Sequence, residues 1–559
     1  MSDNPTRSFQ LLMREPVPPQ RWAKPHPGRA HELKRQDGLS IERNVSVPLR
    51  DGTRILIDIY LPDRKLDEKP PVILGWGPYG KHNQSSNLFP EAGIENGWNS
   101  PYTGFEAPDP IYWCGHGYAV VYADPRGAYY SEGEFRHNGA GEGEDCYDLI
   151  EWLGTQPWSN GKVGMSGVSY LAGIQYLVAS QRPPHLAAIN PWECFTDWYR
   201  EFAYHGGIPE TNFIPRAGGA IANSTNRVED TLANVRAHPL WDAYWESKSV
   251  DLENIVTPAF IVASWSDHGL HSRGSLAAYR RIKSKQKYLL VHGRKKWSHY
   301  YTPGNVERLR QFFFHFLRGT DDSVLSWPPV SLEIRRSAYE WTQRDENEWP
   351  LARTRYVPLY LDARSNSLKP ELVGQESVAR YDSENKDDAA VFNYVFPEAT
   401  ELTGPMKLRL WVEAESATDM DLFVAIQKTD ASGQVVPFMF YACFDNGPVA
   451  LGWLRVSHRA LDEARSTPER PVHSHLREDM LTPGVPVPVD IEIWPSSTYF
   501  EAGERLRVVI KGSDVYAESP PHLPFARHTD LRNRGIHIIH TGGDFDSHLL
   551  IAVTPPAEE

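Results

Sequence analysis

The sequence has little of what would make it a disulfide-stapled, membrane-spanning or nucleic-acid-binding protein. Its 559 residues include only four cysteines, Cys114, Cys146, Cys194 and Cys443, which lack the close pairing of a metal site. No apolar stretch approaches the ~20 residues that a helix needs to cross a bilayer. The net charge is -14 and no Lys/Arg run is present, which argues against a nucleic-acid or membrane partner.

The start of the sequence also predicts no secretory leader, with earlier removal of a processed leader as the alternative. Residues 1–5 lack the basic and then apolar pattern of a signal peptide. Together with the scattered cysteines, this predicts reduced thiols and a cytoplasmic location. The chain is too long for one ordinary core, so we expect two or three domains.

The first part of the chain alternates between apolar strands and helical patterns. Residues 1–40 are rich in proline and basic side chains and predict an extended arm. Residues 41–61 alternate around Asp51-Gly52, which indicates a hairpin. Alternating strands and helices then predict a βαβ sheet. The predicted strands are 71–75, 118–123, 162–165, 187–190, 259–264 and 288–291, and the predicted helices are 144–153, 169–179 and 306–317.

Two other regions break this alternation. Residues 195–255 are rich in aromatic side chains and have only short helical patterns, so we expect a helical cap inserted in an α/β-hydrolase domain formed by 1–194 and 256–350. Residues 351–559 predict a C-terminal all-β jelly-roll sandwich. Its strands alternate over 406–412, 422–426, 489–493 and 506–510.

Ser169 lies between a strand-like stretch and a helical stretch that is apolar nearly all round. Gly167 and Ala172 are small, so strand and helix can approach closely at a sharp turn. This is the pattern of a nucleophile elbow, which holds a catalytic serine at the edge of an α/β-hydrolase sheet. Leu171 replaces the usual second glycine. Ser166 and Ser40 share the Gly-x-Ser spacing as competing candidates.

A serine nucleophile needs a base, and the base needs a carboxylate to orient it. In this fold the order along the chain is nucleophile, acid, histidine. Asp267 follows the strand 259–264 and is the predicted acid. His292 and His299 both follow the strand 288–291; His292 directly adjoins it, whereas His299 has a longer loop with which to reach the serine.

The oxyanion of such a reaction needs two preorganised donors. The backbone N–H of Tyr170, directly after the nucleophile, is one. The loop 75–81 follows an early strand and offers the Tyr79 hydroxyl as the other, although a tyrosine in this place could equally cap the sheet.

The chain resembles the cocaine esterase-like (CocE/NonD) hydrolases, relatives of the X-prolyl dipeptidyl-peptidases and α-amino-acid ester hydrolases. A collinear series of motifs carries the resemblance, which is more specific than any one of them. The series is Gly117-Tyr118-Ala119-Val120-Val121, Asp124-Pro125-Arg126-Gly127, Ser131-Glu132-Gly133-Glu134-Phe135, Gln156-Pro157-Trp158, Gly161-Lys162-Val163-Gly164-Met165, Gly167-Val168-Ser169-Tyr170, Trp265-Ser266-Asp267, Trp297-Ser298-His299 and Phe500-Glu501-Ala502-Gly503-Glu504-Arg505.

The resemblance implies Ser169 as nucleophile, Asp267 and His299 as its partners, and Tyr79 with the Tyr170 N–H as the oxyanion hole. It also implies the hydrolase domain, the helical cap and the jelly roll. Two features depart from the family pattern. Ala172 replaces a glycine common after the elbow, and residues 293–296 replace the Gly-Pro that often precedes Trp-x-His, which keeps His292 as a rival base.

Three further groups of residues favour a structural interpretation. His268 and His271 follow Asp267, but neighbouring ligands rarely share one ion without further partners, so hydrogen bonding around the acid is expected. Arg126 is expected in a buried turn or ion pair. Aromatic side chains at 192–204 and 241–245 are expected to pack in a core, and Glu193, Asp197, Glu201, Glu210 and Asp242 to be solvated, although they could bind a substrate ammonium group.

The sequence therefore predicts a serine hydrolase that cleaves small carboxylic esters, or amides, through an acyl-enzyme on Ser169, with no cofactor or metal. The alternatives are an X-prolyl dipeptidyl-aminopeptidase, an acyltransferase using the same acyl-enzyme, and a non-catalytic binding module in which the elbow is a relic. The sandwich beside the cap offers surface for a homo-oligomer.

Overall fold

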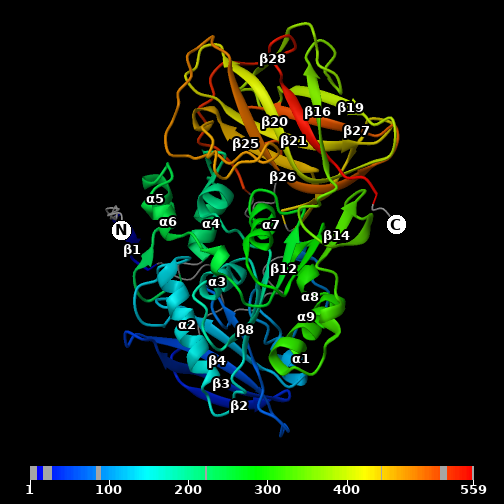
Figure 1. The fold of residues 1–559 in the computed structure, drawn as a ribbon. Coiled ribbons are helices and arrows are strands. Elements are labelled where there is room, and N and C mark those ends of the chain that lie inside the picture. The colour runs from blue at the N-terminus through cyan, green and yellow to red at the C-terminus, as the bar shows by residue number, and fades with distance from the viewer. Residues whose placement is uncertain are drawn as a thin grey trace.

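The structure is a computed structural model that describes residues 9–16, 28–82, 90–220, 223–441, 443–516 and 526–556. Much of the predicted N-terminal arm, including the segment 1–5 inspected for a leader, lies outside the described residues. Within the arm, β2 (Glu32–Gln36) is a strand that pairs with β3 (Leu39–Pro48). Figure 1 shows a lower body with a mixed sheet and helices, and an upper body made of strands.

The lower body is organised by one sheet of order β2-β3-β4-β6-β5-β7-β8-β12-β13-β14-β15. Its strands run parallel from β6 to β14, and the pairs at both ends are antiparallel. The strands not yet given bounds are β4 (Arg54–Pro62), β5 (Val72–Trp76), β6 (Ala119–Asp124), β7 (Val163–Val168), β8 (Leu186–Trp192), β12 (Ala259–Ser264), β13 (Lys287–His292), β14 (Val330–Arg335) and β15 (Trp341–Glu346).

Both faces of this sheet are covered, as its nearly continuous apolar strands require. In β5, Val72 and Leu74 face one core and Ile73 faces the other, because side chains alternate along a strand. The first core includes residues of α2 (Ala140–Gly154) and α3 (Tyr170–Ala179). The second includes residues of α1 (Pro110–Gly115) and α9 (Pro303–Phe313).

The strands and helices predicted for this body are confirmed. The hairpin turns at Gly52, where φ is +85°, a conformation that favours glycine. The last predicted helix differs in detail. It begins at Pro303, whose fixed φ suits a first turn, and after Phe313 its backbone widens into a π-helical turn (Phe314–Arg318) that ends at Gly319 in the left-handed region.

The region between β8 and β12 is an insertion of short elements. It contains a π-helical turn (Tyr199–Ala203), a hairpin of β9 (Tyr204–His205) and β10 (Ile208–Pro209), and strand β11 (Val228–Glu229), which pairs with β1 (Met13–Arg14). Three helices complete it: α4 (Phe213–Ala220), α5 (Thr231–Ala237) and α6 (Ala243–Ser247). In Figure 1 these helices lie between the sheet of the lower body and the strands of the upper one.

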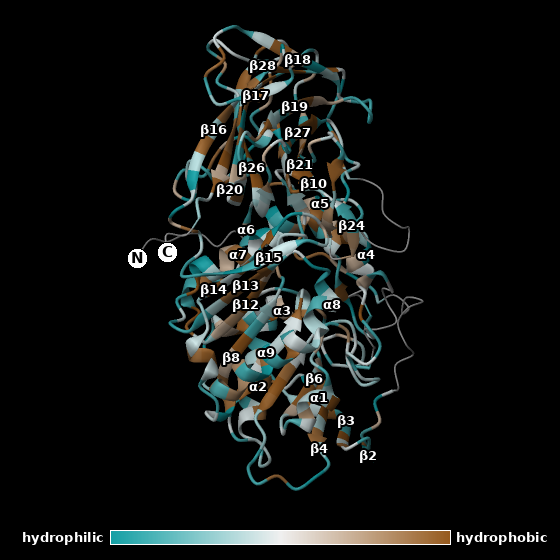
Figure 2. Ribbon diagram, turned by 90° about the vertical axis from the view of Figure 1, so that its right-hand side faces the viewer, coloured by the Kyte–Doolittle hydropathy of each residue, from teal (hydrophilic) through white to brown (hydrophobic). Residues whose placement is uncertain are grey.

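The C-terminal body is all β. One layer has the order β25-β21-β27-β19-β17, and the other contains β26-β20 with β28, β18, β29 and β16. Apolar residues of both layers form one core between them, which Figure 2 shows as brown strands inside the body. The strands of these layers are β16 (Arg355–Asp362), β17 (Ser367–Lys369), β18 (Ser377–Asp382), β19 (Ala390–Val395), β20 (Thr400–Ala414), β21 (Asp421–Thr429), β25 (Ala450–Arg455), β26 (Val487–Phe500), β27 (Arg505–Lys511), β28 (Ile536–Thr541) and β29 (His548–Val553).

Among the described residues, no helix combines the length and the apolar character needed to cross a membrane.

Candidate active site

Ser169 occupies a strained turn between β7 and α3. Its φ is +57° and its ψ is -112°, a conformation that costs a non-glycine residue about 1–3 kcal/mol. Its N–H is held by the carbonyl oxygens of Trp192 and Glu193, at 3.0 and 3.1 Å. Gly167 is required just before it, because a Cβ there would lie 2.5 Å from Leu171 Cβ. The turn therefore has the geometry expected of a nucleophile elbow.

The Ser169 side chain is partly exposed and contacts His271. Its Oγ lies 3.2 Å from His271 Nε2. On the other side of the ring, Nδ1 makes a short hydrogen bond to Asp267 Oδ2. Both Asp267 and His271 are fully buried, and the His271 ring stacks on Phe195 with 5.8 Å between the ring centroids. A hydroxyl, an imidazole and a carboxylate thus form one hydrogen-bonded chain.

A single turn of backbone brings Asp267 and His271 together. The N–H groups of His271 and Ser272 point at the Asp267 carbonyl oxygen, at 3.1 and 3.2 Å. Gly269, inside the turn, has a φ of +92°. Residues four apart on such a turn face the same side, so the two side chains meet immediately after β12 and before α7 (Ser272–Arg281).

Lys296 adds a buried positive charge to this group. It is the first residue of α8 (Lys296–Tyr301), and its Nζ lies 3.0 Å from Asp267 Oδ2 and 3.1 Å from His271 Nδ1. Burial alone would raise the pKa of the Asp267 carboxyl, but the Lys296 ammonium group and the His271 ring hold that pKa well below its usual range. Burial and then the Lys296 charge lower the pKa of His271 to about 4, against the opposing effect of Asp267. The ring is therefore neutral at pH 7 and can accept a proton.

Two more carboxyl groups face the same lysine. Glu106 and Glu193 are both buried. Burial raises the pKa of Glu106 to about 8, and the Lys296 charge and a hydrogen bond from Trp297 Nε1 oppose this. Burial also raises the pKa of Glu193 well above its usual value, again against the Lys296 charge. Burial therefore favours the protonated form of both groups, whereas the pKa of Asp267 is held low, so Asp267 is the carboxyl group at this lysine that most readily carries a charge.

The two expected oxyanion donors adjoin the serine. Burial raises the pKa of Tyr79 well above its usual value, and a hydrogen bond with Ser169 opposes this effect. The Tyr79 ring packs edge-on against Phe105 and Tyr170, with 4.8 and 6.2 Å between centroids. Tyr170 is the first residue of α3, where backbone N–H groups point out of the helix. Its own hydroxyl is occupied by Glu142.

Neither of the two histidines predicted as the base, His292 and His299, is the one that hydrogen-bonds to Ser169. Among the described residues, His271 is the histidine that hydrogen-bonds to Ser169, and this corrects the expectation for His299. His299 lies within α8, where its ring packs 4.0 Å from the His292 ring and 5.8 Å from the Trp192 ring. His292 is buried, with Nδ1 accepting from Arg294 N–H and Nε2 3.0 Å from Glu193 Oε1. The loop after β13 forms a helix at once and therefore does not carry His299 back to the serine.

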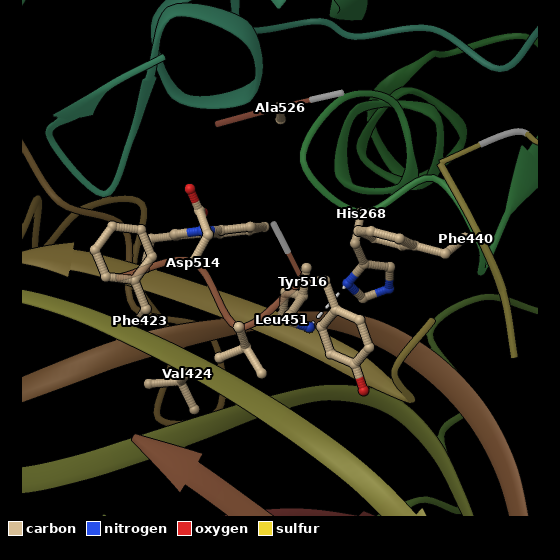
Figure 3. A pocket seen from close by; sticks show the side chains of 10 residues that line it. His268, Phe423, Val424, Phe440, Leu451, Asp514, Tyr516 and Ala526 are labelled. Carbon is tan, nitrogen blue, oxygen red and sulfur yellow. Dashed lines mark hydrogen bonds between the residues drawn. The ribbon is translucent and has the colours of Figure 1, made fainter. Parts of the chain in front are cut away.

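His268 points away from the serine toward the C-terminal body. Its Nδ1 accepts from Leu451 N–H and its Nε2 lies 3.1 Å from Pro495 O. Figure 3 shows the ring at a small cavity lined by Phe423, Phe440, Tyr516 and other side chains of that body. Within the described parts of the chain, no three His, Cys, Asp or Glu side chains converge as metal ligands would. His268 thus hydrogen-bonds to the all-β body rather than around the acid, which corrects the expectation for it, and His271 is the neighbour that adjoins the serine.

The other candidates have structural partners. Ser166 is buried and bonds to Asn190 and Tyr300, and Ser40 lies in β3. Arg126 forms ion pairs with Asp145 and Asp51, as expected. The packing expected for most insertion aromatics is confirmed by the buried side chains of Trp192, Trp198, Tyr199, Phe202, Tyr204, Tyr244 and Trp245.

The expectation of solvated acids in the insertion is wrong for Glu193, Asp197, Glu201 and Glu210, which are buried. Asp197 and Glu201 pair with Arg200 and Arg273, and Glu210 accepts backbone N–H groups. A charged side chain tolerates burial when it is paired, and the sequence does not reveal the partners.

A local signal could have identified His271. The segment Asp267-His268-Gly269-Leu270-His271 places a histidine four residues after the acid, with a glycine between them that permits a tight turn. The nucleophile-acid-histidine order is kept, although acid and base share one strand end rather than two. The site thus collects Tyr79 after β5, Ser169 after β7, Asp267 and His271 after β12 and Lys296 after β13, at the carboxyl ends of parallel strands.

Two family models match most of the chain between them. They are the X-Pro dipeptidyl-peptidase (S15 family), at residues 51–229, and the X-Pro dipeptidyl-peptidase C-terminal non-catalytic domain, at residues 324–550. The first range contains Ser169, and the second contains the strands of the all-β body.

Individual relatives agree with these matches. A CocE/NonD family hydrolase from Staphylococcus aureus, known from its crystal structure, is 40% identical with a TM-score of 0.89, covering 92% of this chain and 94% of that chain. The cocaine esterase of Rhodococcus sp. (strain MB1 Bresler) is 28% identical, in an alignment that covers 71% of this chain and 82% of the relative. The Xaa-Pro dipeptidyl-peptidase of Lacticaseibacillus paracasei is 20% identical, in an alignment that covers 76% of this chain and 62% of the relative.

These similarities extend over both the mixed-sheet body and the all-β body and confirm the resemblance expected from the motifs. The chain is therefore an enzyme that belongs to the CocE/NonD family of hydrolases, related to the X-Pro dipeptidyl-peptidases.

Proposed function

We propose that this enzyme is a serine esterase that cleaves small carboxylic esters through an acyl-enzyme on Ser169. The observation that carries the proposal is the chain of contacts from Ser169 Oγ to His271 Nε2, at 3.2 Å, and from His271 Nδ1 to the Asp267 carboxylate. A neutral imidazole in this position can take the hydroxyl proton, and the carboxylate orients the ring and stabilises the imidazolium that forms.

The proposed reaction has two halves. His271 Nε2 accepts the Ser169 proton while Oγ attacks the ester carbonyl carbon, and the Tyr79 hydroxyl and Tyr170 N–H stabilise the oxyanion. The intermediate then collapses, and the alcohol leaves with the proton from Nε2. Water attacks the acyl-enzyme with His271 again as base, and the acid is released as Oγ regains its proton.

The finer architecture belongs to the same proposal. Residues 195–255 would act as a helical cap over a hydrolase domain of 1–194 and 256–350, and 351–559 would form a jelly roll. The position of the insertion between β8 and β12 supports the cap, and the two mainly antiparallel layers around one core support the jelly roll.

The test is labelling by a fluorophosphonate, which reacts with an activated serine. Ser169→Ala should lose the label and lower the turnover of a p-nitrophenyl ester by at least about 10⁵-fold. Ser166→Ala is the matched control, because Ser166 lies in β7, three residues before Ser169, and outside the hydrogen-bonded chain. Equal labelling of wild type and Ser169→Ala, or loss of label in Ser166→Ala alone, would exclude this mechanism.

An X-prolyl dipeptidyl-aminopeptidase is the second candidate, because both matching family models are named for that activity. Such a peptidase needs the free amine of its substrate. Turnover of Ala-Pro-anilide that disappears when its amine is acylated would favour the peptidase, and equal or faster turnover of simple esters would favour the esterase.

A further inference from the structure

Lys296 contacts the Asp267–His271 pair, although the proposed acyl transfer assigns no step to a cation there. Its side chain is only 4% exposed, and Nζ lies 3.0 Å from Asp267 Oδ2 and 3.1 Å from His271 Nδ1. An isolated buried charge is very costly, so the lysine must be held there by its partners. The ammonium group therefore contacts both the acid and the base of the proposed site, and the Asp267 carboxylate binds the lysine and the imidazole at the same time.

Two other carboxyl groups face Lys296. Asp267 has the largest charge interaction with the lysine, followed by Glu193 and Glu106, and burial raises the pKa of both glutamates, which favours their protonated forms. Among the described residues, the other titratable side chains with a charge interaction with the His271–Asp267–Lys296 group are Cys194, His268, His292, Tyr441 and Cys443. The group therefore holds one carboxylate and one ammonium, with the imidazole between them.

We propose that Lys296 is a positioning residue of this site: it fixes the Asp267 carboxylate against His271 Nδ1, and its charge keeps the His271 ring unprotonated in mildly acidic solution. The inference rests on the proposed function, because it takes His271 as the base. A neutral ring carries one proton, on Nδ1, which it donates to Asp267, and its Nε2 accepts from Ser169. A second proton would put a cation about 3 Å from the ammonium group, and like charges at that distance disfavour the protonated form.

A charge at Lys296 shifts the pH dependence of kcat/KM, whereas a lysine that only filled space would not. Only the neutral ring can take the Ser169 proton, so kcat/KM is lost as the pH falls through the pKa of His271. A nearby cation moves this loss to lower pH. Removing the cation leaves Asp267 unopposed, which raises the pKa of the ring and moves the acidic limb of the profile toward higher pH.

The experiment is the pH profile of kcat/KM for p-nitrophenyl acetate in the wild type, Lys296→Met and Lys296→Arg. In Lys296→Met the acidic limb should move upward by about one pH unit or more, with most activity kept on the alkaline plateau. Lys296→Arg keeps the positive charge and should restore the limb to within a few tenths of the wild-type position. The matched control is Lys428→Met, which removes a similarly buried lysine, 3% exposed and 2.7 Å from Glu504, in the all-β body and should leave the limb unchanged.

Two results would overturn the proposal. One is a folded Lys296→Met enzyme whose acidic limb coincides with that of the wild type. The other needs no variant: a wild-type limb at or above 6.5, the ordinary pKa of histidine, shows that no charge depresses the base, even if Lys296→Met does not fold. Either result leaves the esterase proposal intact, because fluorophosphonate labelling of Ser169 is measured separately at alkaline pH.

Discussion

The segments that follow β12 and β13 are neighbours at the same edge of the sheet, and each contains histidines, yet they contribute different chemistry. After β12, a turn around Gly269 places Asp267 and His271 in one hydrogen-bonded pair facing Ser169. After β13, the chain enters α8, which presents Lys296 to that pair and keeps His299 in a packed cluster with Trp192. A histidine in the expected strand order contacts the serine only if the local turn lets its ring reach the hydroxyl.

The largest effect should separate the two segments directly. His271→Ala removes the imidazole that hydrogen-bonds to Ser169, so kcat/KM for a p-nitrophenyl ester should fall by about 10⁵-fold. His299→Ala is the matched control and should stay within about threefold of wild type, because its ring packs on other rings. Steady-state kinetics on both variants decide the point, and the reverse ranking would return the base to the segment after β13.

The next effect concerns the carboxylate that the two segments share. Asp267→Asn should lower kcat by about 10⁴-fold, because an amide neither fixes the required ring tautomer nor stabilises the imidazolium. Asp514→Asn serves as its control: Asp514 Oδ1 lies 2.8 Å from His528 Nδ1, which repeats the aspartate–histidine contact outside the site. If both variants lost activity equally, the loss would reflect stability, which circular dichroism would reveal as a common drop in melting temperature.

The smallest effect concerns a third segment, the one after β5, and tests whether the Tyr79 hydroxyl stabilises the oxyanion. Tyr79→Phe removes the side-chain donor to the oxyanion and should lower kcat by about 10²-fold with little change in KM, because the donor acts mainly in the transition state. Tyr129→Phe, which removes the hydroxyl that donates to the Tyr79 carbonyl oxygen, is the control for loop position. A larger loss in Tyr129→Phe than in Tyr79→Phe would assign the effect to the loop backbone.

Much of the architecture followed from the pattern of residues. Uninterrupted apolar runs such as 118–123 need cover on both faces, which a helix-flanked parallel sheet supplies, and the alternating runs after residue 400 need cover on one face. The buried acids of the insertion could not be predicted in this way. The burial of Glu201 depends on Arg273, which is 72 residues away and belongs to another element.

The sequence by itself determined the strand-to-helix turn at Ser169, because a small residue at 167 and an apolar helix beyond it permit little else. It also determined that Asp267 would stand at the end of a buried strand. Only the tertiary structure decided which imidazole approaches the hydroxyl and that Lys296 joins the pair. Apolar periodicity locates a residue to within a strand or a turn, whereas proton transfer depends on contacts of about 3 Å, and those depend on how separate elements pack.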